Sequence, residues 1–473
     1  MKMEFPYATP ESMGIDSAAL EKALLAARDG AHRGIEIHDM IVMRKGKIVC
    51  EAYFQPYDRD CRHAIYSQTK SFMSTAMGIA MGDGLVSLED YALDYFPEVD
   101  RAKVSDNAPR MKIKHLMSMA CGHDTDPMGA FREEGAQGFF AWPAPKEPGE
   151  YFFYNTAASN ICGMIVERVT GKSMYALLKE RVFDKLGMDI RESDWLVVNG
   201  ACSGGFGLHV KAMDVLRLAN LYLLGGRWEG EQLIPKEWVE LVSKKKIDCG
   251  NEFTSWAAGY TYQFWNCDFA DAYRIDGAGA QQADIVPEKD MVILFNSALH
   301  GEVSDYAQVL SRYYIYPAVH HEALPENPAA LARLNALVQE LASPVKTAVN
   351  PVPAEAIGCF ETDAEGIKTV EIAQVGEDMH LQLGERKLVF GLAGAWSVFD
   401  NEPAVDGSVA STQKAAGKGR WDGKCFSGRV TLYPDIRSIY ADIEVTKDGL
   451  ALLMKTDWFP AFNNGKVFYA KRG

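Results

Sequence analysis

Apolar residues at the start of the chain follow one helical pattern and then two strand-like ones. A helix is predicted over SAALEKALLAAR, directly after Asp16, because aspartate is a residue type that caps helix N-termini. Residues 38–54 read HDMIVMRKGKIVCEAYF, in which two apolar runs flank Lys45 and Gly46. Apolar runs on either side of such a pair predict a β-hairpin.

The next stretch, YSQTKSFMSTAMGIAMGDG at 66–84, predicts a helix that opens at Ser67 and ends at the Gly-Asp-Gly of 82–84. Its apolar residues follow one another at helical spacing: Phe72, Met73, Ala76, Met77 and Ala80. Because this helix is apolar on nearly every side, we expect it to be central and buried.

Helices and loops are predicted from about residue 86 to residue 200, and strands return after them. The clearest helices of that part are 113–120 and 158–171. After residue 200, a further helix that stops at glycines is predicted over 212–226, and strands are predicted over 256–265 and 283–298. Asn327 and Pro328 suit the cap and first turn of a further helix, which a proline-punctuated linker at 343–353 follows.

The last part of the chain changes to short strands, at 370–375, 379–383 and 387–390, separated by glycine-containing turns. We therefore predict three parts: an α/β (α+β) domain over 1–320 with a helical insert at about 86–200, a helix and linker over 321–353, and a small all-β domain over 354–473.

Composition narrows the function classes. The chain has 473 residues, 48% hydrophobic and 24% charged, a balance typical of globular domains. A net charge of −15 argues against a nucleic-acid or anionic-membrane partner, which would require a basic surface. The nine cysteines are odd in number and form no Cys-x-x-Cys, no His-Glu-x-x-His is present, and no apolar segment of signal-peptide length stands at the N-terminus. We therefore expect a reduced, cytoplasmic chain without metal or other cofactor.

Ser-x-x-Lys, a pattern that can supply a serine nucleophile and its base, occurs four times, with serines at Ser67, Ser243, Ser343 and Ser411. Only Ser67 stands at the head of a predicted buried helix, where unpaired backbone N–H groups lie beside it. Lys70 would lie one turn above it on the same face. Burial lowers the pKa of a lysine, which lets the amine accept the serine proton. The alternative is an N-capping serine with a solvated lysine.

Five blocks of sequence carry a resemblance to a known family. They are YSQTKSFMSTAMGIAMGDGLVSLEDYALDYF, IKHLMSMACGH, PGEYFFYNTAASN, SGGFGLHVKAMDVLRLANLYLLGG and DGAGAQQADIVPEKDMVIL, in that order. The series resembles the serine hydrolases built on the class C β-lactamase and penicillin-binding-protein fold, whose relatives include esterases, D-amino-acid peptidases and 6-aminohexanoate-dimer hydrolases. The resemblance covers about residues 10–315 and implies an antiparallel sheet flanked by helices, with the helical insert facing it across the active-site cleft.

The resemblance also implies roles for single residues. Ser67 matches the nucleophile, Lys70 its first partner, and Tyr154 the tyrosine of a Tyr-x-Asn element, where a phenolate or a phenol bonded to Lys70 would act as base and later as acid. The N–H groups of Ser67 and Ala278 match the oxyanion hole. Residues expected to contact substrate are Trp142, Asn155, Thr156, Asp276 and Gly277.

Two positions depart from the family pattern. The third residue of Tyr-x-Asn is Thr156, although Asn155 is adjacent, and the lysine of the family's Lys-Thr-Gly is Ile275. Without that cation a β-lactam or peptide carboxylate loses its partner, so β-lactamase activity is expected to be weak or absent. The Ser-Asp-Asn at 105–107 reads as a polar loop rather than a catalytic motif.

The apolar loop GFFAWPAPKEPG before Tyr154 fits either a lid or acyl pocket at the site or packing on the insert, and the sequence leaves these interpretations open. The leading hypothesis is a hydrolase that cleaves a small ester or amide through an acyl-Ser67 intermediate. The alternative is a non-catalytic binding or scaffold protein on the same fold. The physiological substrate and the oligomeric state do not follow from the sequence, because many activities share this fold and nucleophile.

Overall fold

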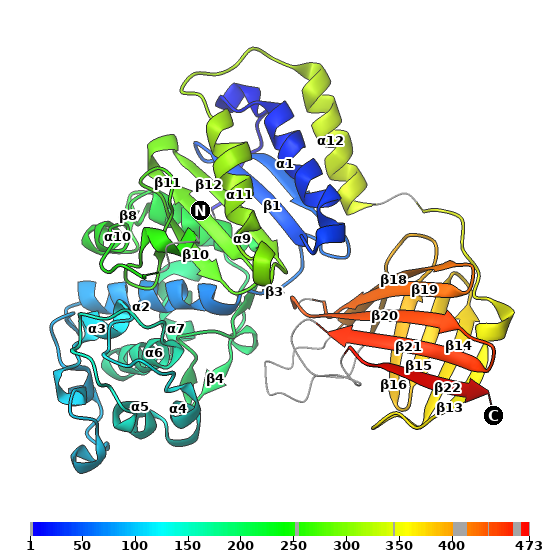
Figure 1. The fold of residues 1–473 in the computed structure, drawn as a ribbon. Helices are drawn as coiled ribbons and strands as arrows, with labels where there is room; N and C mark the ends of the chain where they lie inside the picture. The colour runs from blue at the N-terminus through cyan, green and yellow to red at the C-terminus, as the bar shows by residue number, and fades with distance from the viewer. Residues whose placement is uncertain are drawn as a thin grey trace. The chain divides into compact units, whose positions relative to one another are not determined.

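The computed structural model describes residues 3–250, 255–343, 346–400, 414–433, 435–456 and 465–472. Contacts divide the chain into two compact units (Figure 1). The first comprises Met1–Glu51 with Ala64–Leu334, and the second comprises Ala52–His63 with Asn335–Gly473. The segment that precedes the Ser67 turn therefore belongs to the second unit, and the chain returns to the first unit at Ala64.

The first unit contains a six-stranded sheet built from both ends of its sequence, in the order β2-β1-β12-β11-β10-β9. Its strands are β1 (Ile37–Arg44), β2 (Lys47–Tyr53), β9 (Trp265–Asn266), β10 (Tyr273–Gly277), β11 (Gln281–Val286) and β12 (Met291–Ser297). The pairs β1–β12, β12–β11, β11–β10 and β10–β9 are antiparallel, which confirms the antiparallel sheet that the resemblance implied. The predicted hairpin is present. Its turn consists of Lys45 and Gly46, which both have positive φ.

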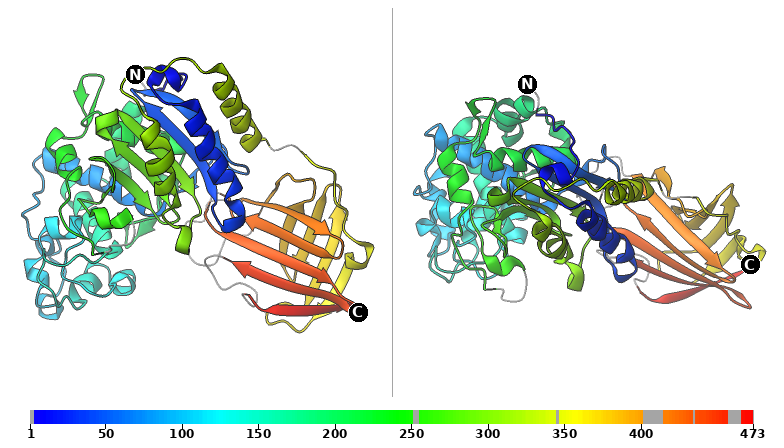
Figure 2. Two further views of the ribbon diagram at one scale, coloured as in Figure 1. Left: turned by 45° about the horizontal axis from the view of Figure 1, so that its top comes forward. Right: turned by 90° about the horizontal axis from the view of Figure 1, so that it is seen from above.

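Helices flank this sheet. Helix α1 (Ser17–Asp29), capped by the Asp16 side chain as predicted, packs against β1 and against the π-helical segment Leu310–Ile315 that continues α11 (Tyr306–Val309). Figures 1 and 2 show α1 and α11 across the same face of the sheet. Helix α9 (Ala212–Leu223) packs against β11 and β12. These contacts bury the apolar strands of the sheet, one of which, β10, reaches the candidate site.

The predicted helical insert is present between the two halves of the sheet. Its helices are α3 (Ile113–Met117), α4 (Met128–Glu134), α5 (Ala136–Ala141), α6 (Thr156–Thr170), α7 (Met174–Leu178) and α8 (Asp184–Leu186). Helix α2 (Thr69–Gly82) contacts α6 and α7, and every residue from Thr69 to Ala80 is buried, as expected for a central helix. Figure 1 shows α2 running between the sheet and the insert.

The remaining elements of this part are short. Helix α10 spans Lys236–Val242. The two-residue strands are β3 (His63–Ala64), β4 (Val197–Val198), β5 (Ala201–Cys202), β6 (His209–Val210), β7 (Arg227–Trp228) and β8 (Glu231–Gln232).

Three predicted elements differ from the structure. Residues 283–298, expected as a strand, form parts of β11 and β12, which the 3₁₀ turn Pro287–Lys289 separates. Residues 256–265, expected as a strand, form a 3₁₀ turn (Ser255–Ala258) and a loop, of which only Trp265 belongs to a strand. Positive φ values at Gly259 (+110°) and Gln263 (+70°) interrupt the extended backbone. The hydroxyls of Ser71 and Ser74 on α2 instead donate to loop carbonyls.

The apolar stretch before Tyr154 is also not wholly a loop. Phe139 and Phe140 lie in α5 with no exposed surface, and Phe140 contacts Phe96 with ring centroids 5.6 Å apart. These two aromatic residues therefore pack within the insert, which favours the packing interpretation over a lid for this pair.

The second unit contains a ten-stranded sheet in the order β16-β15-β14-β13-β22-β21-β20-β19-β18-β17, closed by a pairing of β16 with β18. Its strands are β13 (Gly358–Thr362), β14 (Thr369–Val375), β15 (Asp378–Leu383), β16 (Arg386–Gly391), β17 (Ser397–Asp400), β18 (Lys414–Asp422), β19 (Cys425–Thr431), β20 (Ser438–Val445), β21 (Gly449–Thr456) and β22 (Val467–Arg472). Alternating buried residues such as Leu450, Leu452 and Met454 fill its interior. The all-β prediction is confirmed. The closure of the strands into a barrel-like sheet was not predicted from the sequence.

Helix α12 (Pro328–Ala342) precedes this sheet, and the Asn327 side chain caps it by accepting from the Ala330 N–H, as predicted. All nine cysteines lie within the described residues and are free thiols. Over the described part of the chain, no helix combines the length and apolar character needed to span a bilayer.

Candidate active site

Ser67 lies in a 3₁₀ turn, Tyr66–Gln68, that leads directly into α2. The α-helix thus begins two residues later than the sequence predicted. Tyr66 has a φ of +47°, a conformation that costs energy for a bulky residue and that recurs at functional sites. The turn leaves the Ser67 side chain half-buried at the head of the central helix.

Lys70 points back toward this turn. Its Nζ lies 3.0 Å from Ser67 Oγ, 2.7 Å from the Gly205 carbonyl oxygen and 3.4 Å from Thr156 Oγ1. The residue is only 2% exposed. Burial lowers the pKa of Lys70 to about 7, against the opposing influence of the Asp126 and Asp276 carboxylates. A substantial fraction of the amine is therefore neutral near pH 7.

Tyr154 completes the group. Its hydroxyl is hydrogen-bonded to Ser67, and Lys70 Nζ lies 4.9 Å from the centroid of its ring. Desolvation raises the pKa of Tyr154 well above that of a free phenol, and the Ser67 hydrogen bond only partly opposes this shift. At neutral pH Tyr154 is therefore a neutral phenol rather than the phenolate that the sequence left possible.

An aromatic wall holds the Tyr154 ring in place. Trp265 stacks on it with centroids 5.9 Å apart and planes 20° apart, and Tyr260 meets it edge-on. Trp256 continues the wall through its contact with Trp265 and also hydrogen-bonds the Asp276 carboxylate. Trp256 and Trp265 are half-buried, so part of this wall is open to a ligand.

Thr156 is the position where the family pattern has asparagine, and its hydroxyl takes one of the three acceptor places around Lys70. It begins α6. A side chain at Gly205 would place its Cβ 2.6 Å from Thr156 Cγ2, so only glycine lets the Gly205 carbonyl come this close to the lysine.

Strand β10 approaches the nucleophile turn at Gly277. A Cβ at this position would lie 2.4 Å from the Ile65 carbonyl oxygen and 3.1 Å from the Gln68 nitrogen. The next residue, Ala278, is exposed. Among the backbone hydrogen bonds of the described turns and loops, the Ala278 N–H donates to no carbonyl, which agrees with the role of oxyanion-hole donor expected for it.

Asp276 is engaged by protein rather than left open. Its carboxylate accepts from Arg274 Nε at 2.7 Å, and Arg274 has no exposed surface. Burial raises the pKa of Asp276, and Arg274 opposes that shift. Ile275, between them in sequence, is also fully buried, so no cation stands where the family has its lysine.

Two predicted substrate contacts, Asn155 and Trp142, make side-chain hydrogen bonds within the protein, and their role toward a substrate stays a prediction. Asn155 is 1% exposed, caps α6 by accepting from the Ala158 N–H, and lies with Nδ2 3.0 Å from His123 Nδ1. The Asn155 side chain thus makes its hydrogen bonds within the protein. Its position beside the Tyr-x-Asn pattern had suggested a contact with substrate instead. Trp142 follows α5, and its indole N–H donates to Thr125 Oγ1.

The competing motifs lie elsewhere. Ser243 follows the last residue of α10 and Ser343 follows the last residue of α12, while Ser411 lies outside the described residues. In the Ser-Asp-Asn stretch, Ser105 N–H donates to the Phe140 carbonyl and Asn107 Nδ2 donates to two carbonyls of residues 144–146. These bonds agree with the interpretation of 105–107 as a structural loop.

Sequence reasoning missed the Gly205 carbonyl, the Asp126 carboxylate and the aromatic wall. The Ser-Gly-Gly of 203–205 was a visible signal, since adjacent glycines mark close backbone approach. Asp126 gave no signal, because its charge reaches Lys70 only through the fold. No group of three or more His, Cys, Asp or Glu side chains suited to a metal occurs among the described residues, and the absence of a metal stays a prediction.

Comparison with known proteins identifies the family of the chain. A family model described as Beta-lactamase matches residues 19–312. A 6-aminohexanoate-dimer hydrolase of Paenarthrobacter ureafaciens is 23% identical over 278 residues, which cover 54% of this chain and 70% of that protein.

Solved structures give the same fold. A candidate 6-aminohexanoate-dimer hydrolase from Bacillus anthracis aligns with a TM-score of 0.53 at 21% identity, covering 68% of this chain and 89% of that one. An octameric penicillin-binding-protein homologue from Pyrococcus abyssi aligns with a TM-score of 0.50 at 16% identity over 93% of this chain and all of that one. The chain belongs to the Beta-lactamase family.

Proposed function

We propose that this protein is a serine hydrolase that cleaves a small ester or amide through an acyl-Ser67 intermediate. The observation that carries the proposal is the buried amine of Lys70, 3.0 Å from Ser67 Oγ and with a pKa lowered to about 7. An amine that is partly neutral at physiological pH can accept the serine proton, which a solvated lysine cannot do.

Acylation needs one proton acceptor and one proton donor. Neutral Lys70 takes the proton from Ser67 as Oγ bonds to the substrate carbonyl carbon, and the N–H groups of Ser67 and Ala278 stabilise the oxyanion. Tyr154 then gives its proton to the leaving oxygen or nitrogen as that bond breaks, and the protonated Lys70 restores the phenol. The raised pKa of Tyr154 suits a proton donor.

Deacylation reverses the roles. A water molecule loses its proton to the Lys70–Tyr154 pair as its oxygen attacks the acyl carbon. The tetrahedral intermediate collapses, Ser67 Oγ recovers a proton, and a free carboxylic acid leaves. Each proton is returned, so the pair ends the cycle in its starting state.

Substrate class follows from what surrounds the nucleophile. The aromatic wall of Trp256, Trp265 and Tyr260 favours an apolar group beside the scissile bond. Ile275 offers no cation for a carboxylate, which disfavours β-lactams. The relative named for an amide-cleaving activity on a 6-aminohexanoate dimer adds amides to the candidates. We expect a small-molecule partner and no nucleic acid, given the charge of −15.

The test is turnover of p-nitrophenyl esters of short acids. Ser67→Ala should lose turnover by at least about 10³-fold, while Ser243→Ala, Ser343→Ala and Ser411→Ala, which remove the serines of the other Ser-x-x-Lys copies, should keep wild-type rates. Equal rates for Ser67→Ala and wild type would reject the proposal and return the protein to the binding or scaffold alternative.

A second measurement addresses the substrate class. A chromogenic cephalosporin should be cleaved with a kcat/KM far below that of the esters, because no lysine replaces Ile275. A cephalosporin kcat/KM equal to that of the esters would show that the missing cation is not required.

A further inference from the structure

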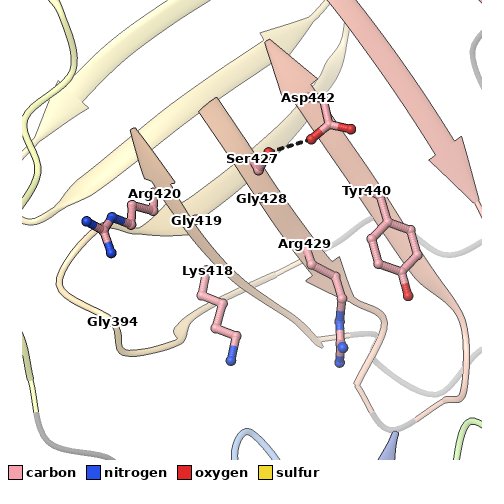
Figure 3. Close-up of a pocket in the computed structure, with 9 residues that line it drawn as sticks. All are labelled: Gly394, Lys418, Gly419, Arg420, Ser427, Gly428, Arg429, Tyr440 and Asp442. Carbon is pink, nitrogen blue, oxygen red and sulfur yellow. Dashed lines mark hydrogen bonds between the residues drawn. The ribbon is translucent and has the colours of Figure 1, made fainter. Parts of the chain in front are cut away.

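The outer face of the barrel-like sheet carries a pocket of about 480 Å³ on strands β18, β19 and β20 (Figure 3). It is lined by Gly394, Lys418, Gly419, Arg420, Ser427, Gly428, Arg429, Tyr440 and Asp442. Pockets that bind small molecules have volumes of about 300–1,000 Å³, and this one is within that range.

Strand register brings its cations together. Lys418 on β18 stands directly opposite Arg429 on β19, and Arg429 stands opposite Tyr440 on β20. Arg420 lies two residues beyond Lys418, on the same face of the strand. Figure 3 shows the Lys418 and Arg429 side chains extending in the same direction from neighbouring strands. Like charges directly opposite each other weaken a sheet.

An aromatic side chain adjoins the two cations. Lys418 Nζ lies 4.7 Å and Arg429 Cζ lies 5.1 Å from the centroid of the Trp396 ring. Contact with an aromatic face attracts a cation and limits the positions of its side chain. Two of the three cationic side chains are therefore held beside the pocket in part by Trp396.

The pocket lining contains more cationic than acidic residues. The lining has three cationic residues, and Asp442 is its acidic residue. Ser427 Oγ donates a hydrogen bond to the Asp442 carboxylate at 2.7 Å. The described lining thus carries more cationic than acidic side chains, on a chain whose net charge is −15.

We propose that this pocket binds a small organic molecule that carries two or more negative charges on phosphate or carboxylate groups. Guanidinium groups match both kinds of oxyanion with paired N–H donors, and Lys418 adds a point charge. Tyr440 supplies a hydroxyl on the far side of Arg429. The lining residues all belong to the second unit and include none of the Ser67, Lys70 and Tyr154 trio, so the proposal does not depend on the chemistry of that trio.

Isothermal titration of the full chain with pyrophosphate and with citrate, at constant ionic strength, tests the proposal and separates the phosphate from the carboxylate source. Saturable binding of at least one of them is expected. Arg429→Gln and Lys418→Gln should each weaken it about tenfold or more, since a charge-assisted hydrogen bond contributes about 1.5–3 kcal/mol. Lys387→Gln, an exposed lysine on β16, is the matched control and should bind as wild type does.

Circular dichroism checks that each variant is folded, and Arg429→Lys, which keeps the charge, should retain more affinity than Arg429→Gln. Ser67→Ala should bind as tightly as wild type, which separates this site from the proposed hydrolase activity. Binding of neither probe up to about 10 mM, a weak regime of affinity, would overturn the proposal. So would equal binding by wild type and a folded Arg429→Gln, or equal losses in Arg429→Gln and Lys387→Gln.

Discussion

Lys70 Nζ lies 3.0 Å from Ser67 Oγ while the lysine is 2% exposed. The distance is that of a hydrogen bond, and the burial lowers the pKa of the amine to about 7. The Lys70 amine is therefore both close to the Ser67 hydroxyl and lowered in its proton affinity. The rate of the proposed reaction should depend on the protonation state of Lys70.

The first prediction concerns pH. The amine must be neutral to accept the Ser67 proton, so kcat/KM on an ester should rise with pH and level off above an apparent pKa near 7. A profile that is flat from pH 5 to pH 9 would contradict this role for Lys70.

The same profile can be shifted by a neighbouring charge. The Asp126 carboxylate raises the pKa of Lys70, so Asp126→Asn should move the rising limb of the profile to lower pH. Asp124→Asn, an exposed aspartate two residues away, is the matched control and should leave the limb in place. A limb that moves to higher pH in Asp126→Asn would have the wrong sign for this account.

The second prediction is that Lys70 and Tyr154 act as one unit. Tyr154→Phe should lower kcat/KM by about 10²–10⁴-fold, the usual contribution of a positioned acid or base. The double mutant that combines Lys70→Ala with Tyr154→Phe should have a kcat/KM only slightly below that of Lys70→Ala alone, because each proton passes through both groups. Losses that multiply fully in the double mutant would mean that the two side chains work independently. Circular dichroism of each variant controls for folding.

The third prediction concerns the approach of β10 to the nucleophile turn. Gly277→Ala would place a Cβ 2.4 Å from the Ile65 carbonyl oxygen, so the strand and the turn must separate. A displacement of about 1 Å in an active site can cost about 10²-fold in rate, and we expect a loss of that order. Gly129→Ala in α4, where a Cβ meets nothing within 4 Å, should keep full activity. A fully active Gly277→Ala would show that this close approach is not needed.

The fourth prediction concerns stability and lies away from the active site. Burial raises the pKa of Asp39 to about 7, although the backbone N–H and Nδ2 of Asn296 both donate to its carboxylate. A folded-state pKa above the unfolded value means that the folded protein binds the proton more tightly. Stability should therefore fall as pH rises from about 4 to about 7 and then stay constant.

Asp39→Asn removes the buried charge. If the Asn296 amide turns over, the Nδ2 of the introduced asparagine can donate to Asn296 Oδ1, which is buried without a partner in the wild type. The variant should be more stable than wild type at pH 8, by at most about 4 kcal/mol, and should gain little at pH 4. Denaturant unfolding at both pH values measures this difference, with Asp271→Asn as an exposed control. A variant less stable than wild type at pH 8 would refute the assignment.

The sequence predicted the elements whose pattern is local. The hairpin at Lys45 and Gly46, the Asp16 cap and the buried helix after Ser67 each depend on residues close together in the chain, and each is present. The segment 256–265 failed because its aromatic composition suits a strand, whereas its carbonyls bond to serines on α2 that are about 190 residues away.

In the candidate site, too, residues in local motifs could be predicted, whereas contacts between distant parts of the chain could not. Ser67, Lys70 and Tyr154 could be named from motif order, and the structure brings them together. Asn155 could not be assigned from its position beside the motif, because its role as the cap of α6 depends on where that helix begins. The Gly205 carbonyl and the Asp126 charge reach Lys70 only across the fold, so no pattern of nearby residues reveals them.

The most direct test of the central claim is covalent labelling with a fluorophosphonate, followed by peptide mapping by mass spectrometry. One labelled serine, Ser67, is expected, with labelling that is lost in Ser67→Ala and slowed in Lys70→Ala. Label on any other serine, or undiminished labelling of the Ser67→Ala protein, would contradict it.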